Sequence, residues 1–157
     1  MTTNHNALLG KPVADDIFAE VQTGVKALQE QGWQPKLVSI SIGNVAAVNL
    51  YVRNQAKGAA RAGIGFEERN LPETISRIEM LGLLQALNTD PRVTGIIIQR
   101  PVPAHLSIKE LQAAVHPLKD VEGMHPASIG NIVYRDVALA PCTAAASVEL
   151  LRRTGLK

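Results

Sequence analysis

A tyrosine, a glutamine and a lysine in one expected helix are the first side chains here that could do chemistry. Tyr51, Gln55 and Lys57 fall within residues 46–62, a helical pattern that ends before Gly63. Residues four positions apart share a helix face, so Tyr51 and Gln55 should point the same way. Lys57 follows Gln55 by two positions, which turns it about 200° around the helix. A phenol and an amide can orient a ligand, but an amide cannot exchange a proton as an amine can.

Two later segments carry further polar side chains of the kind that bind ligands. Gln99 ends an apolar run over residues 93–99, and Pro101 and Pro103 follow it. Because proline lacks a backbone N–H, the chain must leave the sheet there. Glu122 lies in a loop-like segment rich in glycine, proline and aspartate. Taken singly, Tyr51, Gln99 and Glu122 are also typical of a half-buried helix aromatic, a polar strand end and a solvated turn.

The elements that must position these side chains alternate between helix and strand. We expect strands at residues 36–42, 66–71 and 93–99, and helices at 13–31, 46–62, 76–87, 108–115 and 143–153. This order predicts an α/β fold, a three-layer domain with a mostly parallel sheet flanked by helices. Residues 93–99 should form the central strand and 66–71 an edge, Thr143 should cap the last helix, and 117–133 should be irregular. Ligands gather at the carboxyl ends of such strands.

Composition limits the classes of function. With 157 residues, 46% of them hydrophobic, the chain suits one domain with a substantial core. The 16 basic and 14 acidic residues are spread along the sequence, which argues against a nucleic-acid partner. Cys142 and the histidines show no metal-ligand spacing, so no metal is expected. We find no apolar run of about 20 residues and no signal peptide, so we expect no membrane partner and a cytoplasmic location.

Five ordered motifs together are more specific than any one of them. The chain resembles, along nearly its full length, the N-terminal domain of the bifunctional methylenetetrahydrofolate dehydrogenase/methenyltetrahydrofolate cyclohydrolase family. The resemblance implies an α/β catalytic domain that holds the pterin of tetrahydrofolate and is joined to an NADP-binding Rossmann domain. The motifs lie at residues 51–64, 71–74 (Leu-Pro-Glu-Thr), 95–103, 120–126 and 141–143 (Pro-Cys-Thr).

The resemblance also assigns roles to single residues. It implies catalytic roles for Tyr51 and for position 55, where the family has a lysine that handles protons, and it matches Lys57 to a second basic position. It implies substrate contacts for Gln99, Pro101 and Glu122, with the glutamate replacing a family aspartate that pairs with the pterin. Gln99 should face Gln55, amide to amide. Two other departures are Val48 in place of serine and Ala144 in place of proline.

The NADP-binding domain of the family is not expected within this sequence. Gly63-Ile64-Gly65 lacks the third glycine of a phosphate-binding loop and is better explained as a helix stop. Residues 1–157 are therefore expected to be the folate-binding catalytic domain, with a tetrahydrofolate derivative as substrate and no cofactor bound by this chain alone. The resemblance implies a homodimer for the full-length form and leaves open whether a lone domain retains it. The sequence leaves open whether this is part of a longer protein or a one-domain form.

The glutamine at position 55 leaves open whether the chain has the cyclohydrolase activity of the family. The leading hypothesis is a folate one-carbon domain whose cyclohydrolase step is impaired, because glutamine cannot move the protons that this step requires. Hydride transfer to NADP needs alignment more than a protein acid, so it could outlast the cyclohydrolase step. The alternatives are a non-catalytic folate-binding or regulatory module and a divergent enzyme acting on another one-carbon or pterin compound. Whether the chain is an enzyme therefore stays open at this stage.

Overall fold

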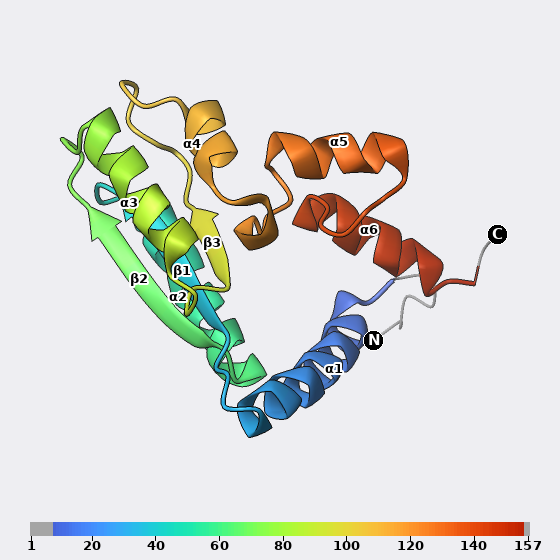
Figure 1. Ribbon diagram of the computed structural model, residues 1–157. Coiled ribbons are helices and arrows are strands. Elements are labelled where there is room, and N and C mark those ends of the chain that lie inside the picture. The colour runs from blue at the N-terminus through green and yellow to red at the C-terminus, as the bar shows by residue number, and fades with distance from the viewer. Residues whose placement is uncertain (1–7, 156–157) are drawn as a thin grey trace.

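The computed structural model describes residues 8–155, which form a three-stranded parallel sheet with helices on both faces (Figure 1). The α/β class expected from the sequence is confirmed. In chain order the elements are α1 (Gly10–Glu30), β1 (Lys36–Ile42), α2 (Ala46–Ala62), β2 (Gly65–Leu71), α3 (Arg77–Thr89), β3 (Gly95–Ile98), α4 (Ile108–Ala114), the 3-10 helix η1 (Pro117–Lys119), α5 (Pro126–Tyr134) and α6 (Cys142–Arg152).

The central strand is β1, because the strand order is β2-β1-β3. The prediction that residues 93–99 form the central strand is therefore wrong, although all four residues of β3 are buried. Burial misled the prediction because the open edge of β3 is covered by the chain near η1, where Ile96 makes a parallel bridge with Asp120. The expected edge position of β2 is confirmed, and its partly exposed residues agree with it.

The two faces of β1 have different roles. Val38, Ile40 and Ile42 belong to the main hydrophobic core, which also contains Met80 and Leu84 of α3. Side chains alternate along a strand, so Ser39 and Ser41 point to the opposite face, which α2 covers. Both serines are nearly inaccessible to solvent. One face of the strand thus supports the core, while the other supplies hydroxyl groups beneath α2.

Local signals explain where the helices begin and end. Gly63 closes α2 with a φ of 79°, a left-handed conformation that glycine adopts without strain, which confirms the expected helix stop. Ser76 starts α3 with a capping box, in which its side chain accepts from the N–H of Glu79 and the carboxylate of Glu79 accepts from the N–H of Ser76.

Two predictions near the carboxyl end of the chain are wrong. Residues 117–133 are not irregular throughout, because η1 occupies Pro117–Lys119 and Pro126 begins α5, which His125 caps by accepting a hydrogen bond from the N–H of Ala127; only residues 120–125 between them are irregular. Proline suits the first helical turn, where its missing N–H leaves no bond unmade. Thr143 does not cap α6, since Pro141 occupies the cap position and Thr143 lies within the first turn.

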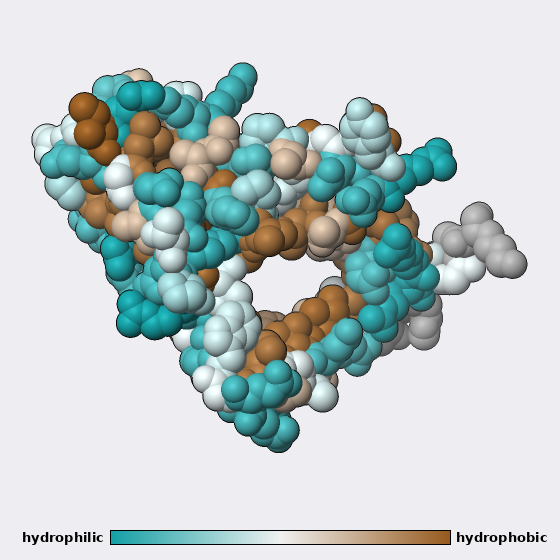
Figure 2. All heavy atoms as spheres, viewed as in Figure 1, coloured by the Kyte–Doolittle hydropathy of each residue, from teal (hydrophilic) through white to brown (hydrophobic). Residues whose placement is uncertain are grey.

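The elements are arranged in a ring around a central opening, and α1 and α6 approach each other on one side of it (Figure 1). The guanidinium of Arg153, just after α6, lies 3.2 Å from the carboxylate of Asp16 in α1. Apolar side chains border the opening (Figure 2). An apolar groove of about 380 Å³, here called the α1–α2 groove, is lined by Ala14, Ile17, Phe18, Val21, Leu37, Gln55, Gly58, Ala59, Ala62 and Ile64. Within residues 8–155, no helix is long and apolar enough to span a membrane.

Candidate functional site

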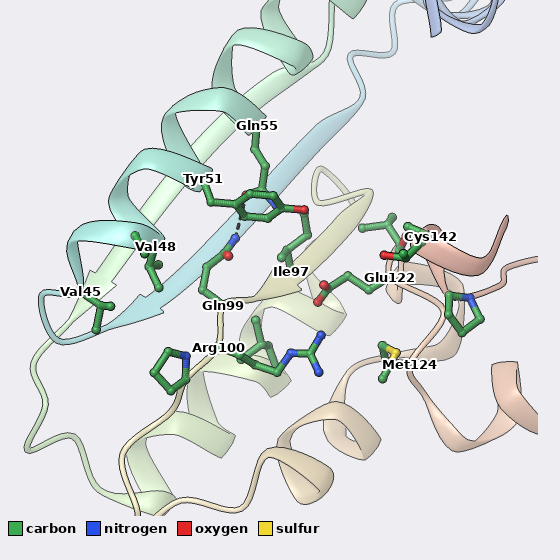
Figure 3. Close-up of a pocket in the computed structure, with 16 residues that line it drawn as sticks. Val45, Val48, Tyr51, Gln55, Ile97, Gln99, Arg100, Glu122, Met124 and Cys142 are labelled. Atoms are coloured by element: carbon green, nitrogen blue, oxygen red, sulfur yellow. Dashed lines mark hydrogen bonds between the residues drawn. The ribbon is translucent and has the colours of Figure 1, made fainter. Parts of the chain in front are cut away.

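A cleft of about 450 Å³ opens where β1 and β3 end, which is where ligands bind in open α/β sheets (Figure 3). Its volume lies within the usual range for small-molecule sites. Apolar side chains form much of its surface, with a few polar groups between them. The lining residues are Val45, Ala47, Val48, Tyr51, Gln55, Ile97, Ile98, Gln99, Arg100, Pro101, Val121, Glu122, Met124, Pro141, Cys142 and Thr143.

One face of α2 forms a wall of this cleft. Val48, Tyr51 and Gln55 are spaced by three and four residues, so their side chains follow one another along the same face. Tyr51 is 60% exposed, and its ring lies across the mouth of the cleft beside Gln99 (Figure 3). Lys57 is exposed and is not among the lining residues. Its catalytic role stays a prediction that the geometry of the cleft does not favour.

The side chains of Gln55 and Gln99 meet as an amide pair. The Nε2 group of Gln99 donates to Oε1 of Gln55 over 2.7 Å and to Oγ of Ser39 over 2.9 Å. Oγ of Ser39 also donates to Oε1 of Gln55 over 3.4 Å. The expected amide-to-amide contact is confirmed. Ser39 also belongs to this hydrogen-bonded group, and it was not predicted from the sequence, although a serine between apolar residues of a strand was a signal for it.

Glu122 faces the cleft from a tightly held segment between β3 and α5. Asp120 organises this segment, since its Oδ2 accepts from the N–H of His125 over 2.7 Å and from the hydroxyl of Ser128 over 3.0 Å. Gly123 has a φ of 66°, and a Cβ atom there would lie 2.3 Å from the carbonyl carbon of Ala140. The backbone around Glu122 is therefore fixed on both sides.

Burial raises the pKa of the Glu122 carboxyl, against the opposing effects of the Arg100 charge and a hydrogen bond from the backbone of Ile98. Burial also raises the pKa of the Cys142 thiol, and the nearby Glu122 charge adds to that effect. The thiol donates a hydrogen bond to the carbonyl oxygen of Val121 over 3.4 Å. Cys142 and Arg100 line the cleft, yet neither was singled out from the sequence as a site residue.

The loop after β3 completes the cleft. Pro101 lines it, which leaves its expected substrate contact a prediction, and the peptide bond between Arg100 and Pro101 is cis. In the part of the chain that the structure describes, no cluster of histidine, cysteine, aspartate or glutamate could hold a metal ion. The cleft thus brings together Tyr51, Gln55, Gln99, Pro101 and Glu122, and of the six expected site residues it leaves out Lys57 alone.

Comparison with known proteins decides the family. Residues 8–122 match the sequence profile of the tetrahydrofolate dehydrogenase/cyclohydrolase catalytic domain. The chain belongs to this family. Its match to the tetrahydrofolate dehydrogenase/cyclohydrolase profile covers the sheet, the wall formed by α2 and the segment that ends at Glu122.

Relatives and solved structures agree with this assignment. The chain is 63% identical to a bifunctional protein FolD 2 of Mesorhizobium japonicum over 95% of its own length and 49% of that protein. It is 55% identical to a FolD 3 of Roseobacter denitrificans over 96% of its own length and 51% of that protein. The FolD structure from Campylobacter jejuni superposes with a TM-score of 0.91 at 30% identity, covering 94% of this chain and 53% of that one. The chain spans about half the length of these tetrahydrofolate dehydrogenase/cyclohydrolase relatives.

Proposed function

We propose that the cleft binds the pterin of a tetrahydrofolate derivative and that the protein serves folate one-carbon metabolism. The observation that carries this proposal is the arrangement of polar groups in one cleft, with Tyr51 and the amide pair on one wall and Glu122 on the opposite wall (Figure 3). A flat bicyclic ligand suits the space between them, because Ile97, Val121 and other apolar side chains line it.

Glu122 is the group best suited to recognise the pterin. An amino-pyrimidine edge offers adjacent N–H donors, and a carboxylate can accept two parallel hydrogen bonds from such an edge. The half-buried position of Glu122 strengthens these bonds by excluding water. Glutamate is one methylene longer than the aspartate of the family, so the ligand would sit slightly further from the segment that carries Glu122.

The cyclohydrolase step is the part of the family's chemistry that this site supports least. Opening a methenyl bridge requires a group that can take up and release protons near Tyr51. At that place Gln55 offers only an amide, and Oε1 of that amide already accepts hydrogen bonds from Gln99 and Ser39. We propose that this chain hydrolyses methenyltetrahydrofolate slowly or not at all.

The substitution Gln55→Lys tests this proposal. A lysine at position 55 can donate to the oxygen of Gln99 once that amide turns, and it adds the missing proton-transfer group. We expect the rate of methenyltetrahydrofolate hydrolysis to rise by about a hundredfold. The loss of methenyl absorbance measures this rate. The control is Gln55→Met, which has a similar length and no amine. If Gln55→Lys binds tetrahydrofolate and shows no gain over Gln55→Met, the role assigned to position 55 is wrong.

Among the residues that the structure describes, the turn that would have to hold the phosphates of NADP does not fit them. A dinucleotide phosphate site needs a glycine-rich turn from a strand into a helix. The β1–α2 turn of the described chain has one glycine, Gly43, followed by Asn44 and Val45. A structure of the Trypanosoma brucei relative, 30% identical and with a TM-score of 0.86, holds NADP, and this chain covers 51% of it. We propose that residues 1–157 are the folate-binding domain and that any dehydrogenase activity requires a nucleotide domain beyond these residues.

A non-catalytic folate-binding or regulatory module is the second candidate function. It is favoured by Gln55 and Val48, which place an amide and an isopropyl group where the resemblance implies a lysine and a serine. Titration calorimetry with tetrahydrofolate tests for binding. Binding without turnover in the wild type would support a module, whereas no binding at millimolar ligand would exclude both candidates. Turnover of another pterin compound would instead indicate a divergent enzyme.

A cytoplasmic location and a homodimer also remain proposals. The proposal of a cytoplasmic location rests on the sequence, in which the one cysteine cannot form an internal disulfide and no signal peptide is recognised. Exposed apolar side chains such as Val133 and Tyr134 on α5 offer a surface that a second copy could cover. Light scattering of the purified protein measures the oligomeric state.

A further inference from the structure

The amide pair formed by Gln55 and Gln99 lines the cleft and keeps one donor and one acceptor free of bonds within the pair. Oε1 of Gln55 accepts from both Gln99 and Ser39, so the group it leaves for a ligand is its Nε2, which can only donate. The Nε2 of Gln99 is likewise used by Gln55 and Ser39, which leaves the Gln99 oxygen, which can only accept. The pair therefore presents one donor and one acceptor side by side, and no charge.

The pairing of one donor with one acceptor does not depend on which way the two amides are turned. Turning one amide alone would place two N–H groups or two oxygen atoms against each other, so the amides must turn together. Turning both exchanges their roles, and the hydroxyl of Ser39 can donate or accept in either case. The cleft still meets one donor and one acceptor. Because Ser39 and Gln99 are nearly buried, with exposures of 0% and 6%, water does not readily replace these bonds.

The chemistry of folate one-carbon forms determines which of them this pair complements. The closed methenyl form has a cationic bridge between its two nitrogen atoms, with neither an N–H nor a carbonyl oxygen at the bridge. The ring-opened N-formyl form has both, since one nitrogen carries the formyl carbonyl and the other keeps its hydrogen. These two groups match the donor and the acceptor of the amide pair, whereas the closed cation would leave both amide groups without partners.

We propose that Gln55, held by Gln99 and Ser39, makes this cleft selective for an N-formyl tetrahydrofolate over the closed methenyl form. The proposal rests on the proposed folate function, because Glu122 must first hold the pyrimidine end of the pterin. Figure 3 shows Glu122 across the cleft from Gln99 and Tyr51. With the pyrimidine end of the pterin at Glu122, the other end of the pterin and its one-carbon group would point to the amide pair. Gln55 is thus a specificity-determining residue.

The test compares ligands that differ only at the group concerned. Titration calorimetry gives the dissociation constants of 5-formyltetrahydrofolate, which has the carbonyl and the neighbouring N–H, and of 5-methyltetrahydrofolate, which keeps the N–H and lacks the carbonyl. We expect the wild type to bind the formyl compound about tenfold more tightly, the effect of one hydrogen bond between neutral groups. The variant Gln55→Met should bind the two compounds equally.

A second variant keeps the size of the side chain at position 55 and replaces its hydrogen-bond donor by an acceptor. In Gln55→Glu the carboxylate still accepts from Gln99 and Ser39, but it offers the ligand only a negatively charged acceptor. The formyl preference should disappear, and methenyltetrahydrofolate, measured in mildly acidic buffer where it persists, should bind more tightly than to the wild type. Circular dichroism and thermal melting confirm that each variant is folded.

The outcomes separate this inference from the proposed function. Equal affinity of the wild type for the formyl and methyl compounds, or a formyl preference that survives in Gln55→Met, would overturn the role of the amide pair and leave folate binding intact. Absence of binding by tetrahydrofolate and by both substituted compounds would overturn the proposed function, and the inference would fall with it. A formyl preference that Gln55→Met abolishes supports the proposal.

Discussion

At the scale of single residues, the site depends on side chains whose surroundings decide their chemistry. Glu122 illustrates this, because burial in the cleft raises its pKa while the charge of Arg100 opposes that shift. The sequence identified Tyr51, Gln55 and Glu122 through their motifs, and the cleft brings them together. The serine in the apolar strand was a signal for Ser39, but the sequence could not supply its partners, because Gln55 and Gln99 are 16 and 60 positions away and only the fold brings them near.

Replacement of Glu122 by glutamine should stabilise the free protein near neutral pH. A carboxyl whose pKa is raised on folding holds its proton more tightly in the native state, so its charged form costs stability above the folded pKa. That cost vanishes below the unfolded pKa of about 4.3. The melting temperature of Glu122→Gln should therefore exceed that of the wild type at about pH 7, with the difference fading near pH 4.

The same variant should weaken folate binding, because it removes the negative charge that we propose holds the pyrimidine edge. Calorimetric titration with tetrahydrofolate should show at least about a tenfold loss of affinity. A variant that is both less stable at neutral pH and unchanged in affinity would contradict the environment and the role given to Glu122.

At the scale of elements, the best predicted parts are those with strong local signals. The stop of α2 at Gly63 and the cap of α3 at Ser76 follow from glycine and serine chemistry that acts within a few residues. The irregular assignment of residues 117–133 failed because glycine and proline are also compatible with a helix that begins at Pro126. The bridge between Ile96 and Asp120, which hides the edge of β3, is a contact between distant segments and leaves no local pattern.

Substitution of Gly123 by alanine should destabilise the segment that carries Glu122. The residue has a φ of 66°, and the new Cβ would lie 2.3 Å from the backbone of Ala140, so strain and overlap add together. We expect a loss of about 2–5 kcal/mol in the free energy of unfolding. Gly130→Ala is the matched control, because nothing lies within 4 Å of its Cβ position in α5. Urea denaturation that shows equal effects for both variants would contradict this account.

Loss of the capping box should weaken α3. Ser76→Ala removes the side-chain acceptor for the N–H of Glu79, and we expect a loss of about 1 kcal/mol by urea denaturation. Ser147→Ala in α6 provides the comparison, since that hydroxyl only bonds back to the carbonyl of Thr143 within the helix. A cost for Ser147→Ala as large as that for Ser76→Ala would show that the capping geometry is not the cause.

At the scale of the whole molecule, the ring leaves apolar surface uncovered. Figure 2 shows this surface around the opening, where the α1–α2 groove lies. The periodicity of residues 13–31 predicted an amphipathic α1, and α1 forms, but only Val25 of its side chains is buried. Amphipathic spacing indicates that a helix has an apolar face, and it says nothing of how completely that face is covered within one chain.

Lysine substitutions on this face should reduce hydrophobic surface without unfolding the protein. Ile17 and Val21 line the groove and are 43% and 36% exposed, so the double variant Ile17→Lys, Val21→Lys should bind about half as much of a hydrophobic fluorescent dye. Ile78→Lys is the control, because Ile78 is 79% exposed and lies away from the groove. Unchanged dye binding with an unchanged circular dichroism spectrum would show that the groove is not the accessible apolar surface.

The separation of the two faces of β1 has a consequence for how this domain can evolve. Val38, Ile40 and Ile42 anchor the core, while positions 48, 55 and 122, where the sequence resemblance implies other residues in the family, line the cleft and lie outside that core. Exchange of side chains around the cleft therefore leaves the packing that maintains the fold largely untouched. The side chains of the cleft can therefore change while the scaffold stays stable, so common ancestry constrains the architecture of this domain more strongly than it constrains the residues that line its cleft.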